Sequence, residues 1–174
     1  MVLNFIILFI PLANINFQNL DYDNWELKKD KDSIKVYIRN IDESTKEYRA
    51  ETIIRSDIDN IFNTITDFDN SYKWMYKLNS SEILKKTDTL MYVYFVVDIS
   101  WPLKNRDLVS DAVIKRDIDN IKIEMNSTPN YIPLNNKLVR INKSRSIWNL
   151  EKIDNFSTKV TLQSYAVVDG IPIF

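Results

Sequence analysis

The chain of 174 residues contains no cysteine and no histidine. The absence of cysteine excludes disulfides and cysteine nucleophiles. The absence of histidine excludes Ser-His-Asp triads, and the two absences together exclude the usual zinc sites. General acid–base catalysis near neutral pH would therefore need a carboxylate, a lysine or a tyrosine with a shifted pKa.

Glycine is also scarce, with Gly170 as its single occurrence. A phosphate-binding loop needs several glycines, so that class of nucleotide site is excluded. The net charge is −1, and neither sign of charge forms a long run. This balance gives no indication of a nucleic-acid partner or of charge-driven attraction to a membrane. No Asp-x-Asp-x-Asp-Gly calcium loop occurs, and we expect no metal and no other cofactor.

The remaining composition is that of a globular protein. Apolar residues make up 45% of the chain and charged residues 27%, which argues against disorder. No linker or low-complexity segment divides the body of the chain. The length therefore suits one domain with a full-sized core.

The first 18 residues begin with an apolar run. Val2 to Leu12 is interrupted by Asn4 and is too short to span a bilayer, which needs about 20 apolar residues. Its length suits a signal peptide with Ala13 near the cleavage position, although no Lys or Arg precedes it. Residues 1–18 are thus a candidate signal peptide, which predicts a periplasmic or secreted protein. The alternative is a first helix packed on the domain of a cytoplasmic protein.

Alternating apolar residues predict three strands followed by a helix. Residues 24–41 have the pattern of a hairpin with its turn at 29–33, and 46–56 that of a third strand. Ser56, with Asp59 three residues later, predicts a capping box at the start of the helix. Four apolar residues then recur at the spacing of one helix face, namely Ile58, Ile61, Phe62 and Ile65.

Strand patterns dominate the rest of the chain. They cover residues 82–86, 89–99, 107–116, 120–127, 137–150 and 157–168. So many strands with one early helix predict an α+β domain with a long antiparallel sheet, strongly curved if it is to close. Such a sheet buries its apolar face either against another sheet or around a helix.

Five stretches, in this order, resemble the START domain, the StAR-related lipid-transfer member of the helix-grip (Bet v 1-like, SRPBCC) superfamily. They are WELKKDKDSIKVYIRNI, TDFDNSYKWM, SWPLKNRDLV, LVRINKSRSIWNLEK and VVDGIPIF, within residues 24–174. They are similar to the opening hairpin, the Asp…Trp segment, the Pro-Trp-Pro…Arg-Asp turn, the Val-Arg…Trp strand and the Asp-Pro-Gly-Gly…Ile-Pro signature of that family. The resemblance implies a helix-grip fold whose internal cavity binds a lipid or another hydrophobic small molecule, without catalysis and with transient membrane contact.

Two features depart from the family pattern. The Asp-Pro-Gly-Gly signature is reduced to Asp169-Gly170, and the chain stops at Phe174, where the long C-terminal helix of START domains should begin. That helix closes the ligand cavity in the family. We therefore expect residues 19–174 to form a START-like domain that is truncated and lacks its lid helix.

The Trp-Pro…Arg-Asp turn supplies the first candidate site residues. Trp101-Pro102 ends a strand, where proline is tolerated because the ladder stops. Arg106 and Asp107 are interpreted as a charge-assisted brace that fixes the turn. The alternative for Arg106 is that it holds a polar head group. One face of the following strand then carries Leu108, Ser110, Ala112 and Ile114.

The position of Ala112 bears on the ligand. In cholesterol-carrying START domains a buried arginine lines the cavity six residues after the motif arginine, and here that position is Ala112. The resemblance therefore implies a more apolar wall and gives no support for a sterol ligand.

Two later strands complete the predicted cavity wall with Trp148 and with Leu162, Ser164 and Ala166. The alternative is that these residues form an ordinary core face. Arg140 is either a surface charge or the partner of an internal carboxylate such as Asp98. The predicted ligand-binding set is Trp101, Arg106, Leu108, Ser110, Ala112, Ile114, Arg140, Trp148, Leu162, Ser164 and Ala166.

Two other functions stay open at this point. The first is an enzyme of the same superfamily, such as a polyketide cyclase or aromatase, which would need an inward-facing acid–base group. Its candidates are Tyr94, Tyr165 and Arg140. The second is an interaction module whose interior is filled by side chains, which a pocket of ligand size would argue against.

Overall fold

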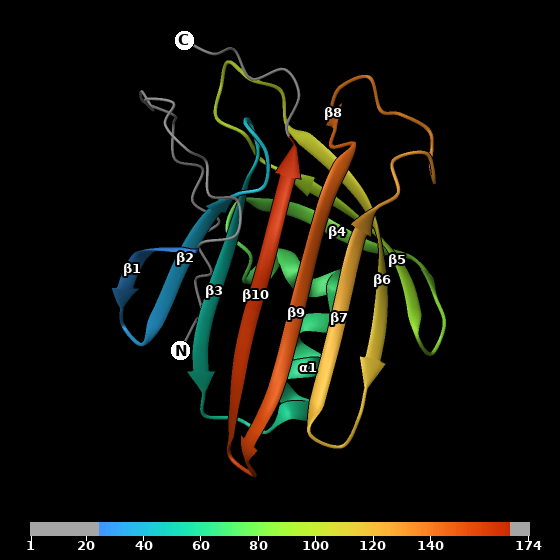
Figure 1. Ribbon diagram of the computed structural model, residues 1–174. Coiled ribbons are helices and arrows are strands. Elements are labelled where there is room, and N and C mark those ends of the chain that lie inside the picture. The colour runs from blue at the N-terminus through green and yellow to red at the C-terminus, as the bar shows by residue number, and fades with distance from the viewer. Residues whose placement is uncertain (1–24, 168–174) are drawn as a thin grey trace.

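The computed structural model describes residues 25–167 (Figure 1). The candidate signal peptide at 1–18, Asp169-Gly170 and the expected truncation at the lid helix lie outside the described residues. Those expectations therefore stay predictions.

One large sheet makes up most of the described domain. Its strands run in the order β1-β2-β3-β10-β9-β7-β6-β5-β4, and every neighbouring pair in this order is antiparallel. The short β8 pairs in parallel with the start of β6. The strands are β1 (Glu26–Lys31), β2 (Ile34–Asn40), β3 (Lys46–Ile54), β4 (Leu78–Lys86), β5 (Leu90–Val97), β6 (Arg106–Arg116), β7 (Asn120–Ser127), β8 (Val139–Arg140), β9 (Lys143–Asp154) and β10 (Ser157–Val167).

The sheet curves around helix α1 (Ile58–Thr66), which lies behind β7, β9 and β10 in Figure 1. A 3-10 helix, η1 (Phe68–Lys73), follows α1 and packs against β4. This arrangement confirms the predicted α+β helix-grip fold, with a curved antiparallel sheet and an early helix.

Helix α1 forms because its apolar residues share one face. Ile58, Ile61 and Ile65 are buried against the sheet, as the spacing predicts. The N-cap is Asp57, whose carboxylate accepts a hydrogen bond from the Asn60 amide at 2.9 Å. The predicted capping box at Ser56 is therefore wrong by one residue, because Asp57 is placed to receive the free amide of the first turn.

The predicted strand at 137–150 is divided into two. Val139 of β8 pairs with Arg106 of β6, whereas β9 pairs with β7. Ser127 marks the crossing point, because its hydroxyl donates to the Asn142 carbonyl and accepts from the Ser144 amide. The chain thus moves from the edge of β6 to the edge of β7 between the two strands.

The two faces of the sheet have different environments. The inner face is the concave side, where Met91, Val93 and Ile123 pack with α1 in the hydrophobic core. The outer face is the convex side, where residues 128–138, here called the outer loop, lie over β5 and β6. The backbone amide of Thr128 donates to the Val109 carbonyl, and the ring of Tyr131 stacks on that of Tyr92 with ring centroids 4.0 Å apart.

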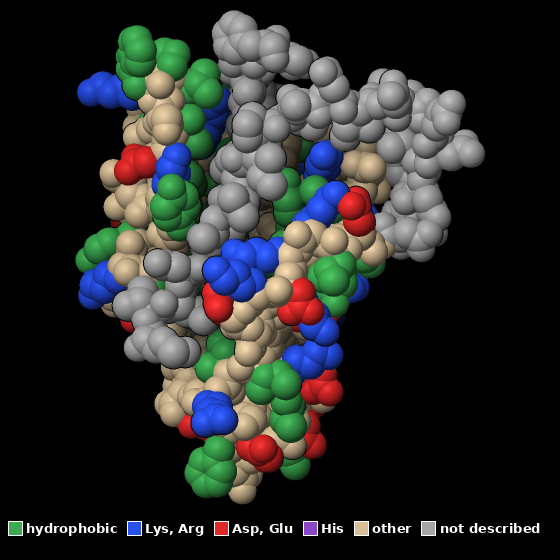
Figure 2. Space-filling model, turned by 90° about the vertical axis from the view of Figure 1, so that its left-hand side faces the viewer, with side chains coloured by type: hydrophobic (Ala, Val, Ile, Leu, Met, Phe, Trp, Pro, Cys, Tyr) green, Lys and Arg blue, Asp and Glu red, His purple; other side chains and the backbone are tan. Residues whose placement is uncertain are grey.

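The surface carries mixed charge. Figure 2 shows lysine and arginine side chains interspersed with acidic and apolar ones on the face that it presents. Among the described residues, no helix is long and apolar enough to cross a membrane.

Candidate functional site

The inner face brings together most of the predicted site residues. On β6, the side chains alternate so that Leu108, Ser110, Ala112 and Ile114 share this face with the core. On β10, Leu162 lies opposite Trp148 of β9, and Ser164 lies opposite Ser146. The inner face thus holds Arg106, Leu108, Ser110, Ala112, Ile114, Trp148, Leu162, Ser164 and Ala166.

The chemistry of the inner face changes along the strands. Near α1 it is apolar and buried, with Ala112, Ile123 and Trp148 in the core cluster. Toward the start of β6 and the end of β10 it carries short hydroxyl side chains. Ser110 lies opposite Ser127, and the Ser146 and Ser164 hydroxyl oxygens are 2.7 Å apart. The part of the face near α1 is therefore packed by the helix, whereas the far part carries hydroxyl groups among apolar side chains such as Leu108.

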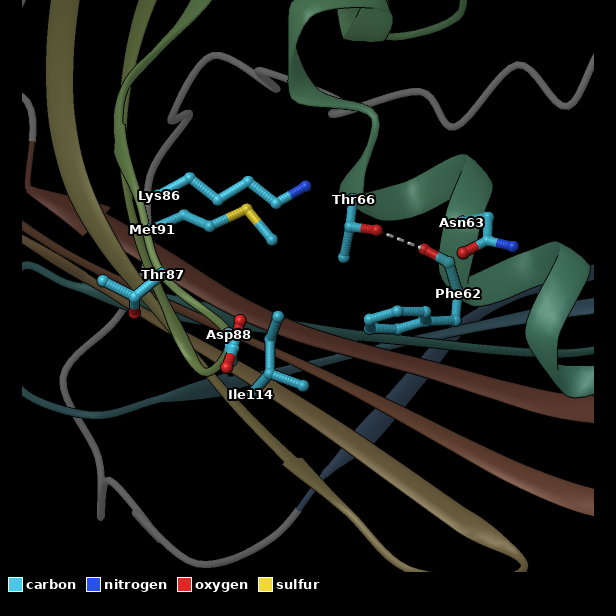
Figure 3. Close-up of a pocket in the computed structure, with 8 residues that line it drawn as sticks. All are labelled: Phe62, Asn63, Thr66, Lys86, Thr87, Asp88, Met91 and Ile114. Carbon is cyan, nitrogen blue, oxygen red and sulfur yellow. Dashed lines mark hydrogen bonds between the residues drawn. The ribbon is translucent and has the colours of Figure 1, made fainter.

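An open pocket of about 410 Å³ lies between α1 and the β4–β6 side of the sheet (Figure 3). Phe62, Met91 and Ile114 supply apolar surface, and the side chains of Lys86 and Met91 extend toward α1 in Figure 3. The remaining lining residues are polar, namely Asn63, Thr66, Thr87 and Asp88. The Thr66 hydroxyl donates back to the Phe62 carbonyl at 2.8 Å, so it is already satisfied. The volume lies within the range of about 300–1,000 Å³ that small-molecule sites occupy.

Arg106 occupies the inner face at the start of β6 and is 3% exposed. Its Nη1 donates to the Lys104 carbonyl, and its Nε has no hydrogen-bond partner. Within residues 25–167, no carboxylate forms an ion pair with it. The predicted Arg106–Asp107 brace is therefore wrong, because consecutive strand residues point to opposite faces.

Asp107 instead pairs with Arg140 on the outer face. Arg140 Nε is 3.0 Å from Oδ1 and Nη2 is 2.8 Å from Oδ2 of this carboxylate. Arg140 also donates to the carbonyls of Pro129, Ile132 and Pro133 in the outer loop. The structure thus corrects the placement of Arg140 in the cavity wall and identifies its carboxylate partner as Asp107 rather than Asp98.

The Trp-Pro loop at residues 98–105 is held by its asparagine. Asn105 donates to Asp98 at 2.8 Å and accepts from the Ile99 amide at 2.9 Å, which closes the loop on itself. Trp101 is 90% exposed at this loop and contributes nothing to the wall of the inner face. Its place in the predicted ligand-binding set is thus corrected to a surface position.

The three candidate acid–base groups lie on the outer face. The Tyr94 hydroxyl donates to Asp107 at 3.2 Å, and burial, followed by the Asp107 charge, raises the pKa of Tyr94 above its usual value. Tyr165 lies opposite Arg145, on the side away from Ser164. Since Arg140 is also on the outer face, the inner face receives none of these three side chains.

Sequence reasoning missed several residues of the site. Lys86 and Met91 reach the pocket from the β4–β5 hairpin, and Phe62 reaches it from α1. Ser146 was missed because its contact with Ser164 depends on the β9–β10 register, which periodicity alone does not specify. Among the described residues, no group of three or more carboxylates is arranged to hold a metal ion.

Comparisons with individual known proteins identify the family of this chain, although no family model matches it. The uncharacterized protein PA1579 of Pseudomonas aeruginosa is 30% identical over 143 residues, which cover 81% of this chain and 71% of that protein. The solved structure of a STAR-related lipid transfer protein fragment from Xanthomonas axonopodis is 34% identical, with a TM-score of 0.80 over 87% of this chain and 86% of that one.

A more distant structure has the same fold. Human StAR-related lipid transfer protein 5 superposes with a TM-score of 0.74 at 18% identity, over 87% of this chain and 76% of that chain. The shared curved sheet, the early helix and the identity to the bacterial lipid transfer protein together show that this chain belongs to the START (StAR-related lipid-transfer) domain family.

Proposed function

We propose that this protein binds a lipid or another hydrophobic small molecule on the inner face of its sheet and acts as a carrier for it. Support comes from the START-family neighbours and from the absence of the three acid–base candidates from the inner face. The enzyme alternative therefore has none of its three candidate groups, Tyr94, Tyr165 and Arg140, on the inner face, and a carrier needs none.

The observation that carries the proposal is the incomplete burial of a central strand. β10 lies between β3 and β9, yet Leu162 and Ser164 are half-buried and Ala166 is exposed. The inner face of a central strand is normally covered by large apolar side chains. Here Ser164 and Ala166 are small where a large apolar side chain would be expected, which supports a ligand site on this face.

A chain ligand on this face would gain affinity from burial. Each buried CH₂ group contributes about 0.8 kcal/mol, so a ligand chain covering Leu108 and Leu162 would be held mainly by its length. A membrane offers the apolar chain of the ligand an environment about as favourable as the inner face of the sheet. Loading and release at a membrane surface would then be close to balanced in free energy, as carriage requires.

Native mass spectrometry of the full 174-residue chain tests this function. A bound mass that is lost on denaturation and identified as a lipid or another hydrophobic molecule is expected. A well-folded protein that carries no such mass, and takes up none from a lipid extract, would contradict the proposal.

A pair of variants makes the test specific to the inner face. Ser146→Ala combined with Ser164→Leu fills the part that carries hydroxyl groups without leaving an unpaired hydroxyl, and should displace the ligand. Thr161→Leu adds comparable bulk to the other face of β10 and should leave the ligand bound. Equal ligand retention in both proteins would place the ligand elsewhere.

A further inference from the structure

Four charged side chains are buried in the described part of the chain, namely Glu47, Arg106, Asp107 and Arg140. Three of them are paired. Asp107 and Arg140 bind each other, and Glu47 accepts from Arg39 at 2.8 Å and from Gln163 at 2.9 Å. Arg106 differs, because its single described bond goes to the Lys104 carbonyl, which carries no charge.

A buried cation without a counter-charge is costly. Transfer of a guanidinium out of water is compensated in native proteins by an acidic partner or by a full set of hydrogen bonds. Arg106 has neither within residues 25–167, and its buried Nε is left without an acceptor. The described residues therefore leave this acceptor unsupplied.

The geometry of the unpaired group indicates what that acceptor is. A guanidinium offers parallel N–H groups along one edge, and these match the two oxygens of a carboxylate or of a phosphate. Nη1 donates to Lys104, and Nε is enclosed without an acceptor, so an oxyanion would reach this edge of the guanidinium as the ligand loads. One unpaired positive charge suits an oxyanion better than a neutral hydroxyl, because only the oxyanion neutralises it.

The location connects this group to the ligand-binding face. Arg106 is followed on the same face of β6 by Leu108 and Ser110. Leu108 is half-buried and packs against the core, and Ser110 carries a hydroxyl two residues further along the same strand face. An oxyanion at Arg106 would therefore have both a second polar group and apolar surface for its chain beside it.

We propose that Arg106 binds the anionic head group, a carboxylate or a phosphate, of an amphipathic ligand whose apolar chain lies on the inner face. This inference rests on the proposed function and adds the charge class of the ligand to it. It predicts that the protein discriminates between chains of equal length by their head group.

The experiment compares three ligands on the delipidated full chain. Palmitic acid, the lysophosphatidic acid with the same acyl chain, and hexadecanol are titrated separately, and bound ligand is measured by native mass spectrometry. Wild type should bind at least one of the two anions about tenfold or more tightly than the alcohol, since a hydrogen bond to a charged group exceeds a neutral one by that order. Whichever anion binds more tightly identifies the head group as carboxylate or phosphate.

Arg106→Met keeps the length of the side chain and removes its charge. It should bind the anions and the alcohol with similar affinity, while the ligand-free variant melts at or above the wild-type temperature because an unpaired buried charge has been removed. Arg145→Met is the matched control. It removes an arginine that pairs with Glu124 on the outer face, and should keep the preference for the anion.

The outcomes separate the two proposals. If wild type binds acid, phosphate and alcohol equally, or if Arg106→Met weakens all of them equally, the inference is overturned while the binding function stands. If none of the three ligands binds, the inference is overturned, and the binding function is decided separately by the uptake from a lipid extract described above. Should Arg106→Met not fold, the comparison of ligands on the wild type decides by itself.

Discussion

Arg140 and Asp107 come from strands 33 positions apart in the chain and form a two-point ion pair on the outer face. Their side chains are 4% and 1% exposed, and Arg140 extends the contact to three carbonyls of the outer loop. The pair therefore ties the outer loop, β6 and β8 into one unit. Both charged groups are buried away from water, so each needs the other as its counter-charge.

Breaking this pair from one side is expected to be severe. Asp107→Ala leaves a buried arginine without a counter-charge and should lower the free energy of unfolding by about 3–5 kcal/mol. Urea denaturation followed by circular dichroism measures the loss. The double variant Asp107→Leu with Arg140→Met should recover much of it, because no charge is left buried.

The exposed pair of Lys159 and Glu151 serves as the control. Their charged atoms are 3.8 Å apart on the surface, and Glu151→Gln should change the free energy of unfolding by less than about 1 kcal/mol. A loss for Asp107→Ala as small as that of the control would contradict the role assigned to the buried pair.

The N-cap of α1 gives a second prediction. Asp57→Ala removes the acceptor of the Asn60 amide and should reduce stability by about 1 kcal/mol. Ser56→Ala should have a much smaller effect, because Asp57 rather than Ser56 caps the helix. Thermal denaturation of the two variants compares them directly, and a larger loss for Ser56→Ala would restore the capping box that the sequence predicts.

Glu124 on the outer face gives a pH-dependent prediction. Hydrogen bonds from Arg145, with Nη2 at 2.6 Å, and from Lys122 lower the pKa of Glu124 below its usual value. A carboxylate with a lowered pKa in the folded state adds stability that is present above its unfolded pKa and is lost as the pH falls through the folded pKa. Glu124→Gln should therefore be less stable than wild type at pH 7, by at most about 1 kcal/mol because the pair is partly exposed.

The same comparison in strong acid completes the test. Below the folded pKa the wild-type carboxyl is itself neutral, so the difference between wild type and Glu124→Gln should vanish. Urea midpoints measured from pH 7 downward follow the difference. A gap that is unchanged across this range would mean that Glu124 acts through packing rather than through charge.

Trp101 gives a prediction about membrane contact. We propose that this 90% exposed indole, on the loop beside the start of β6, inserts at a lipid surface during loading. Vesicles of phosphatidylcholine should shift the tryptophan emission of wild type to shorter wavelength. Trp101→Ala should weaken vesicle binding without lowering stability, since the side chain makes little contact with the domain.

Phe156 provides a matched control at the opposite end of the sheet. It is 80% exposed in the turn between β9 and β10, far along the strands from the 98–105 loop. Phe156→Ala should leave vesicle binding unchanged. Equal weakening by both variants would indicate nonspecific adsorption of exposed aromatic residues rather than a defined contact at Trp101.

Local patterns in the sequence predicted the elements well. The 2-residue alternation located the strands, and the spacing of Ile58, Ile61 and Ile65 located α1 and its buried face. Strand alternation also placed Leu108, Ser110 and Ala112 together, because side chains on one strand face are set by the backbone alone. The order of motifs then correctly identified the START family.

The assignment of partners was decided by the tertiary structure. Arg106 and Asp107 are neighbours in the chain and were expected to brace each other, but a strand directs them to opposite faces. Asp107 then pairs with Arg140, because the parallel β6–β8 contact brings the two side chains to one point. No local pattern encodes that register, since it depends on where the outer loop returns to the sheet.

The sequence by itself thus determined the class of elements, the apolar face of each and the exclusion of histidine and cysteine chemistry. Only the folded sheet decided which charges are neutralised and which one is left on the inner face. The physical reason is that periodicity acts within one strand, whereas ion pairs and the burial of Arg106 arise between strands distant in the chain.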